Sequence, residues 1–234
     1  MNDVYELTWD SHFFGYLVGR IDLSVVDESY LDMILRKSKL AGYKLVYAFL
    51  PYSKILNDNF VNEHNGLLAD VKVTYQYKIE DTDEEKMILE EYRGNANGLY
   101  SLAYASGAYS RFLMDRNFGK ETFCRLYQKW IDNSVYGKLA DKVFMYQEGG
   151  GIVGFVTLKF CESAGSIGLI AVDSNLRGRS IGTHLIDSCK KEAFNNKIHT
   201  LTVATQLSNN LACSFYEKNG FVISENMNIY HFWL

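Results

Sequence analysis

The sequence predicts an α/β fold, because patterns typical of strands and of helices alternate along most of its length. One observation is a short apolar strand, residues 167–172, which leads through a glycine-containing loop into an amphipathic helix. Another is a pair of alternating segments around the triplet Gly149–Gly151, which predicts a hairpin. A third is a helical segment that Asn209 caps and that Gly220 ends.

The first third of the chain predicts a small α/β half. Its expected elements are a strand over 17–23, a helix over 29–41, a strand over 44–50 that ends at Pro51, a helix over 54–65 and a strand over 71–77. The acidic segment 80–86 reads as a solvated linker. We therefore expect an N-terminal domain at 1–80 and a second domain at 87–234.

Two stretches of the first half are similar to stretches near the C-terminus. Residues 44–53 resemble residues 199–208, and Asn65–Leu67 resembles Asn219–Phe221. These similarities suggest that the first half is a reduced copy of the second, and chance explains them equally well. The first half has no counterpart of the loop at 177–182, so we do not expect it to bind the same ligand.

The remainder of the chain predicts a larger α/β domain. The expected elements are a strand over 87–92, helices over 99–105 and 121–135, hairpin strands over 143–148 and 152–160, a strand over 166–172, a helix from 181, a strand over 200–205 and a helix over 209–220. The glycine triplet reads as a turn and not as a phosphate loop, because no helix follows it.

Composition narrows the class of protein. The chain has 234 residues, 47% of them hydrophobic, which is enough to bury a core in one or two domains. A net charge of −4 gives no general attraction to nucleic acid. With no apolar run near about 18 residues and no signal-like start, we expect no membrane association and a cytoplasmic location. The four cysteines and five histidines show no ligand spacing, so we expect reduced thiols and no metal.

The loop between the strand and the helix is the strongest candidate for a binding site. It reads Asp-Ser-Asn-Leu-Arg-Gly-Arg-Ser-Ile-Gly over 173–182. A turn of this kind directs backbone N–H groups to one point, and the helix N-terminus adds partial positive charge, which together suit a pyrophosphate. No Gly-Lys-Ser/Thr follows, so the loop is not a nucleotide P-loop. An ordinary turn before a surface helix is the alternative.

Arg177, Ser180 and Gly182 resemble the acyl-CoA loop of the GNAT family of acetyltransferases, although Ser180 stands where that loop has its first glycine. A second GNAT motif is matched in order and spacing by Asn209, Ala212, Tyr216, Gly220 and Phe221. The resemblance covers 87–234 and implies a mixed, mostly antiparallel sheet flanked by helices. It also implies acetyl-CoA as the co-substrate.

In that family the tyrosine protonates the departing CoA thiolate, which makes Tyr216 the expected catalytic residue. Its phenol, with an ordinary pKa of about 10, stays protonated at neutral pH; the alternative is a ring that only fills a groove. The N–H of Ala171 or Val172 is the expected oxyanion donor, and either water or an unassigned group is the base. The expected acetyl-CoA site comprises Leu169, Ile170, Ala171, Val172, Arg177, Gly178, Arg179, Ser180, Ile181, Gly182, Thr183, Asn209 and Ala212.

The segments 9–15, 106–112, 126–135 and 203–206 resemble the dTDP-fucosamine acetyltransferase branch of the family. This resemblance implies an acceptor with the 4-amino group of a dTDP-linked 4-amino-4,6-dideoxy sugar. It also implies that Tyr109 and Arg111 bind the acceptor, with a surface ion pair as the alternative for Arg111.

Two other functions stay open at this point. One is acetylation of a different amine, such as a peptide N-terminus or a polyamine, and the other is a non-catalytic acetyl-CoA-binding module. We also expect a homodimer, because the aromatic C-terminal strand, 229–233, reads as a sheet edge that needs cover.

Overall fold

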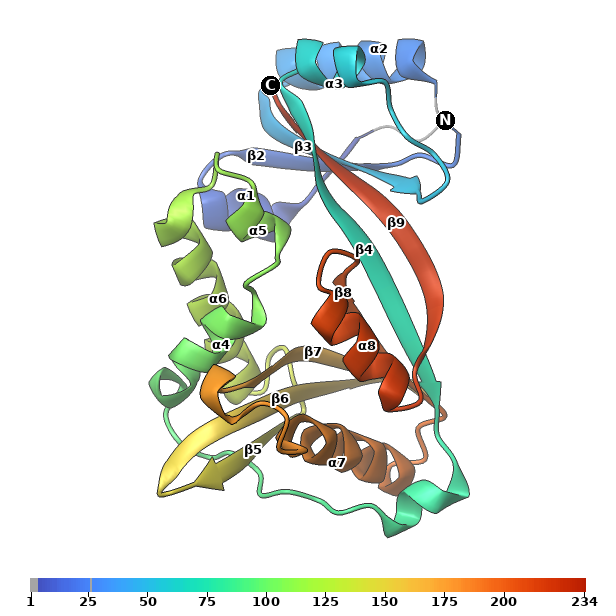
Figure 1. The fold of residues 1–234 in the computed structure, drawn as a ribbon. Helices are drawn as coiled ribbons and strands as arrows, with labels where there is room; N and C mark the ends of the chain where they lie inside the picture. Colours follow the sequence, from blue (N-terminus) through green and yellow to red (C-terminus); the bar gives the residue numbers. More distant parts are fainter. Residues whose placement is uncertain (1–3, 26) are drawn as a thin grey trace. The chain divides into compact units, whose positions relative to one another are not determined.

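The computed structural model describes residues 4–25 and 27–234 and divides the chain into two compact units. One unit comprises Met1–Val73 and Glu225–Leu234, and the other comprises Thr74–Ser224. The last ten residues therefore belong with the N-terminal unit. The strands β4 (Gly66–Lys78) and β9 (Val222–Trp233) each contribute residues to both units (Figure 1).

The first unit is a sheet with the strand order β1-β2-β3-β9-β4. Its apolar core joins α2 and α3 to β2, β3 and β9, with Leu31, Val46 and Phe232 fully buried. Its elements are β1 (Tyr5–Glu6), α1 (Thr8–Phe14), β2 (Leu17–Asp22), α2 (Glu28–Leu40), β3 (Tyr43–Pro51), α3 (Asp58–Glu63), β4 (Gly66–Lys78) and β9 (Val222–Trp233).

In the second unit the sheet runs β4-β8-β7-β6-β5. Its other elements are η1 (Asp81–Glu85), η2 (Ala96–Leu99), α4 (Tyr100–Ser106), α5 (Arg111–Met114), α6 (Gly119–Val135), β5 (Lys142–Glu148), β6 (Gly151–Cys161), β7 (Ala164–Val172), η3 (Ser174–Leu176), α7 (Ile181–Asn195), β8 (Thr200–Gln206) and α8 (Asn210–Lys218).

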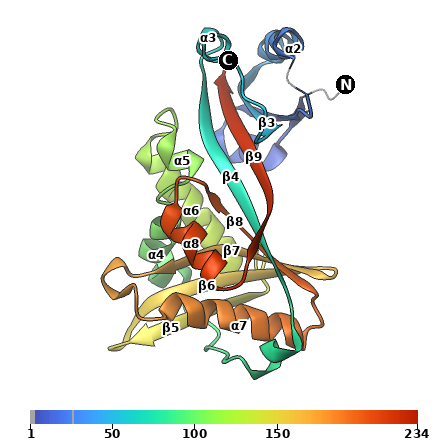
Figure 2. The ribbon, with the colours of Figure 1, turned by 45° about the vertical axis from the view of Figure 1, so that its right-hand side comes forward.

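Helices cover both faces of the sheet in the second unit. Phe155 packs in a cluster with Leu102 of α4 and Ile131 of α6. The neighbouring Gly154 lies against Ile181 and Leu185 of α7. Because successive residues of a strand face opposite sides, α7 covers one face and α4 with α6 cover the other (Figure 2). This arrangement confirms the predicted mixed sheet flanked by helices.

Strand pairing is mostly antiparallel. β2 with β3 and β7 with β8 are parallel, whereas β1 with β2, β3 with β9, β5 with β6 and β6 with β7 are antiparallel. The hairpin at the glycine triplet is confirmed, with Gly149 at φ 60° and Gly150 at φ 80°. No helix within 4–25 and 27–234 is long and apolar enough to cross a membrane.

Three local predictions are wrong. The predicted strand at 87–92 makes only an isolated bridge, Glu91 to Phe144, beside β5. The acidic segment is not a solvated linker, because Asp83 is fully buried and accepts a hydrogen bond from Tyr77. The C-terminal strand is not an edge, because β9 lies between β3 and β4. An exposed C-terminal edge strand therefore gives no reason for a homodimer, which stays a prediction.

Candidate active site

The predicted anion loop leads from β7 to α7, and two of its residues have positive φ. Gly178 is at φ 80°, and Ser180, the N-cap of α7, is at φ 61°. Glycine adopts this left-handed conformation without cost, whereas a residue with a Cβ is strained there. Ser180 therefore adopts the conformation that a glycine would occupy at this position of the loop.

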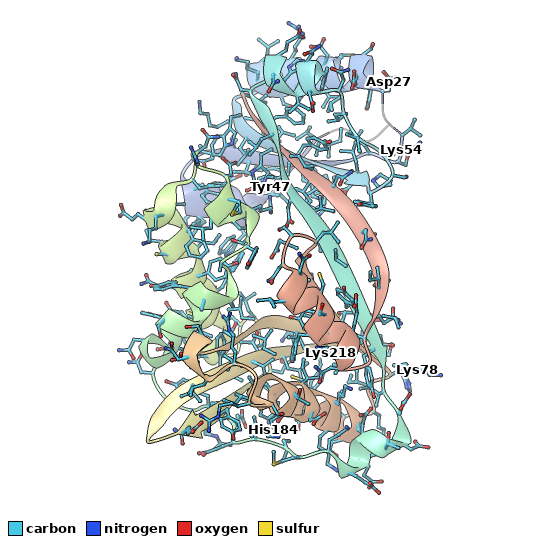
Figure 3. The ribbon with its side chains drawn as sticks, in the orientation of Figure 1. Asp27, Tyr47, Lys54, Lys78, His184 and Lys218 are labelled. Atoms are coloured by element: carbon cyan, nitrogen blue, oxygen red, sulfur yellow. The ribbon has the colours of Figure 1, made fainter. Side chains whose placement is uncertain are left out.

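The first turn of α7 contains N–H groups that the helix itself does not use. Its helical bonds begin with the N–H of His184 donating to the carbonyl oxygen of Ser180 at 3.0 Å. The N–H groups of the preceding turn have no acceptor within the helix. Among the described residues no side chain caps this helix, and its first turn carries no acid. Figure 3 marks His184 in that turn. The arrangement favours a bound anion.

Two arginines accompany the loop. The Nε of Arg177 donates to the carbonyl oxygen of Val172 at 3.3 Å, which holds this side chain at the end of β7. Arg179 pairs with Glu148 at 2.8 Å, and both side chains are exposed. An exposed pair of this kind is weak, so Arg179 is free to change partner when a stronger anion binds.

β7 and β8 separate beside this loop. They are parallel and paired from Ala164–Thr200 to Ile167–Val203. Beyond that point β7 continues to Val172 and β8 to Gln206 without further pairing in the described register. The separation leaves a stretch of β7 backbone facing β8 without a ladder partner, so that stretch is available to a ligand's amide groups.

The direction of the N–H groups along this stretch follows from neighbouring bonds. Asp173 N–H donates to Val153 of β6 at 2.8 Å, and Leu169 N–H donates to Thr157 Oγ1 of β6, also at 2.8 Å. Because N–H groups alternate between the two edges of a strand, Ala171 N–H also faces β6. Val172 N–H faces the open side. Of the two predicted oxyanion donors, the geometry favours Val172.

Thr157 and Phe215 contact residues of the candidate site, and the sequence indicated neither of them. Thr157 is buried, and its hydroxyl accepts the Leu169 N–H where the β6–β7 register shifts. Phe215 of α8 packs on Gly182, since a Cβ at Gly182 would lie 3.0 Å from its ring. That contact joins α7 to α8, the helix that carries Tyr216.

Tyr216 lies in α8 with only 4% of its surface exposed. Its ring centroid is 5.6 Å from Tyr75, 5.3 Å from Phe215 and 5.9 Å from Phe221. Burial raises the pKa of the Tyr216 phenol well above its usual value, and the thiols of Cys213 and Cys189 raise it further. The phenol is therefore protonated at every physiological pH, as a proton donor must be.

The second sequence motif folds as predicted at both ends of α8. Asn209 Oδ1 accepts the N–H of Ala212 at 3.2 Å, which is an N-cap bond. Gly220 has φ 83°, the left-handed conformation expected after a helix. Lys218, marked in Figure 3, lies in the last turn. The cap occupies one acceptor site of the Asn209 side chain and leaves its amide donors for a ligand.

The predicted acceptor residues lie on a separate segment after α4, the helix that packs on β7. Tyr109 is 42% exposed, and the Arg111 guanidinium lies 4.4 Å from the centroid of the Phe112 ring. Gly107 is needed before them, because a Cβ there would lie 2.2 Å from the Tyr127 ring. The segment therefore carries an exposed tyrosine ring and, two residues later, a guanidinium that lies over the ring of Phe112.

Within the described residues, no group of three His, Cys, Asp or Glu side chains could hold a metal ion.

Residues 108–221 match the model of the acetyltransferase (GNAT) family, so the chain contains a GNAT acetyltransferase domain. The chain is similar to a dTDP-fucosamine acetyltransferase of Escherichia coli, with 25% identity over 99% of this chain and 96% of that protein. It is also 26% identical to the spore coat polysaccharide biosynthesis protein SpsD of Bacillus subtilis over 60% of this chain. The chain spans about half the length of SpsD, 48%.

A solved GCN5-related N-acetyltransferase from Sphaerobacter thermophilus has a similar fold. Its TM-score is 0.55 at 13% identity, with 86% of this chain and 64% of that chain covered. At this identity the likeness concerns the fold alone.

Proposed function

We propose that the protein is an acetyl-CoA-dependent N-acetyltransferase that acts on the amino group of a dTDP-linked 4-amino-4,6-dideoxy sugar. The similarity to dTDP-fucosamine acetyltransferase over nearly the whole length of both proteins carries the choice of acceptor. The open N-terminus of α7 beside the separated strands β7 and β8 supports the choice of acetyl donor.

In this proposal the CoA pyrophosphate binds the N–H groups of 178–183, and the pantetheine arm lies along the open edge of β7. Arg177 and Arg179 add positive charge at the phosphates, and Asn209 donates from its amide. Binding in this way holds the thioester beside the acceptor, and proximity supplies much of the rate.

The acceptor amine attacks the thioester carbonyl, so that a C–N bond forms and the C–S bond breaks. The N–H of Val172 stabilises the charge on the carbonyl oxygen. Tyr216 gives its phenolic proton to the departing thiolate, and the amine gives up its own proton to water. Burial raises the pKa of the Tyr216 phenol, so the phenol is in the protonated form that a donor needs when the thiolate leaves.

Tyr109 and Arg111 are proposed to bind the nucleotide part of the acceptor. An exposed tyrosine ring can stack on a base, and a guanidinium matches phosphate oxygens. A polyamine or a peptide N-terminus would instead need acidic groups around the acceptor site.

The test is acetylation of a substrate panel followed by mass spectrometry. With acetyl-CoA, a dTDP-4-amino-4,6-dideoxy sugar should gain one acetyl group, while spermidine and a peptide amine should stay unmodified. Acetylation of the polyamine or peptide alone would contradict the proposed acceptor. Acetyl-CoA binding without turnover on any amine would instead favour a non-catalytic module.

A further inference from the structure

The end of β4 places one buried tyrosine against α8, the helix of Tyr216, and a second against the turn that follows this helix. Tyr75 is 1% exposed and Tyr77 is 9% exposed. They are two residues apart on one strand, so both side chains face the same side of the sheet. The strand comes from the first third of the chain, yet Thr74–Ser224 forms one compact unit that includes both tyrosines and α8.

Tyr75 contacts both Tyr216 and Glu217, the residue that follows it on α8. The two ring centroids are 5.6 Å apart with a tilt of 42°, and the Tyr75 hydroxyl donates to Glu217 Oε1 at 2.9 Å. Burial, followed by hydrogen bonds with Cys213 and Glu217, raises the pKa of the Tyr75 phenol. Since Cys213 and Glu217 are four residues apart on α8, the hydroxyl lies against that one face of the helix.

Tyr77 makes the same kind of bond to a different element. Its hydroxyl donates to Asp83 of η1 at 3.1 Å, and its ring lies 5.3 Å from Phe221, in the turn after α8. The Lys190 ammonium sits 3.6 Å from the centroid of the same ring. Tyr77 therefore stabilises the packing of η1, α7 and the turn, whereas Tyr75 holds the turn of helix that carries Tyr216.

We propose that Tyr75 is a positioning residue that fixes the orientation of the Tyr216 phenol. This inference rests on the proposed role of Tyr216 as the general acid. α8 is a short helix of nine residues, so each of its contacts has a large share in setting its rotation about its own axis. Tyr75 restrains that rotation twice, through its ring on Tyr216 and through its hydroxyl on Glu217. A general acid loses rate when its donor atom shifts by even a fraction of an ångström.

The experiment is a double-mutant cycle on Tyr75→Phe and Tyr216→Phe, with Tyr77→Phe as the matched control. All three changes remove one hydroxyl and keep the ring, so each protein should fold. Tyr75→Phe should lower kcat by about 3- to 10-fold at an unchanged KM for acetyl-CoA. In the Tyr216→Phe background it should lower kcat no further. Tyr77→Phe should leave kcat near that of the natural protein.

Two results would overturn the positioning role: the same loss from Tyr75→Phe in both backgrounds, or an equal loss from Tyr77→Phe. If Tyr216→Phe alone turned over normally, the proposed acid would fail first and the positioning role with it. If Tyr216→Phe were slow but Tyr75→Phe normal, only the positioning role would fail.

A readout without activity comes from ¹³C-labelled tyrosine, with the Tyr216 ring signal assigned by its absence in Tyr216→Phe. We expect that signal to move or broaden in Tyr75→Phe and to stay unchanged in Tyr77→Phe. An unmoved signal in Tyr75→Phe would contradict the proposed contact, whether or not a substrate is known.

Discussion

The two halves of the chain repeat one plan, a strand, a helix and a second strand parallel to the first, and they differ at the start of the helix. In the first half β2 leads into α2 and pairs with β3, and in the second half β7 leads into α7 and pairs with β8. Asp27, marked in Figure 3, caps α2 by accepting the N–H of Tyr30 at 3.0 Å. Ser180 leaves the first turn of α7 open.

The charge at the two helix starts is opposite in sign. α2 has Asp27 as its cap and Glu28 in its first turn, and Glu28 also accepts the N–H of Asn57 at 2.6 Å. Asp27 occupies the N–H of Tyr30, and the negative charge of both carboxylates repels an anion. The residues just before α7 include Arg177 and Arg179, and its first turn carries no acid. The same plan therefore yields one helix terminus that a side chain caps and one that we propose binds phosphate.

The two parallel strand pairs also differ, because only the pair in the first half stays joined along its whole length. β2 pairs with β3 along its whole length, from Leu17 to Asp22, and Leu23 N–H extends the pairing to Phe49. β7 leaves β8 after Ile167. Two strands that pair along their whole length use their facing backbone groups, whereas strands that separate leave those groups for a ligand. The common origin of the halves stays a prediction, but the contrast explains why only the second half is proposed to bind acetyl-CoA.

The largest expected effect comes from removing the proposed acid, Tyr216 of α8. The first half has no counterpart of it, because α3, which follows β3 as α8 follows β8, contains no tyrosine. Tyr216→Phe should keep the fold and the acetyl-CoA affinity, because the ring still packs. Turnover should fall by about 10²- to 10⁴-fold, and the loss should lie in kcat. Steady-state kinetics with the dTDP-4-amino sugar measure it. A loss of less than about tenfold would leave the tyrosine as a groove-filling ring.

A second change makes the start of α7 resemble the start of α2. Thr183→Glu places a carboxylate in the first turn, where it favours the helix but repels the pyrophosphate. The Kd for acetyl-CoA should rise by about tenfold or more, with no loss of thermal stability. Thr183→Gln is the matched control and should bind normally. Unchanged affinity in the Glu variant, measured by calorimetry, would remove the phosphates from this loop.

Alkaline pH should weaken the second half in particular. Burial first of all raises the pKa of both Tyr75 and Tyr216, so the folded state keeps protons that the unfolded state releases above about pH 10. Stability is therefore complete below that pH and is lost as the pH rises, by up to about 1.4 kcal/mol per pH unit for each tyrosine. Denaturant titrations of Tyr216→Phe should show a shallower decline. An identical decline would contradict the burial argument.

The smallest expected effect concerns the caps themselves. Ser180→Gly should relieve the left-handed strain and raise the free energy of unfolding by about 0.5–1 kcal/mol. Asp27→Ala should instead lower it by about 1 kcal/mol, because α2 loses its cap. Urea unfolding distinguishes the two. If Ser180→Gly destabilised the protein, the serine would hold a contact that its backbone conformation does not explain.

Short-range sequence patterns correctly predicted the structural elements that depend on neighbouring residues alone. The periodicity of α7, the cap of α8 and the glycine turn of the hairpin are all local features, and each was found in the structure. The order of strands depends on distant pairing, so the position of β9 inside the sheet was missed. Asp83 looked like part of a linker because its buried partner, Tyr77, is on another element.

The candidate site shows the same division between residues that local motifs indicate and residues whose partners are distant in the chain. Residues in the loop and in α8 follow from motifs, but Thr157 and Tyr75 act through partners 12 and 142 residues away in the chain. Nothing in a single sequence marks such a pair. The choice of Val172 over Ala171 also needed the direction of the strand's hydrogen bonds.

The most direct measurement follows the backbone amides of both helix starts while acetyl-CoA is added to ¹⁵N-labelled protein. The amide signals of 178–183 should show the largest shifts, because their N–H groups are proposed to bind the pyrophosphate. The amides of 27–30 should stay in place, because Asp27 and Glu28 close that terminus. Equal shifts at both termini, or shifts confined to 27–30, would contradict the assignment of the acetyl-CoA site to α7.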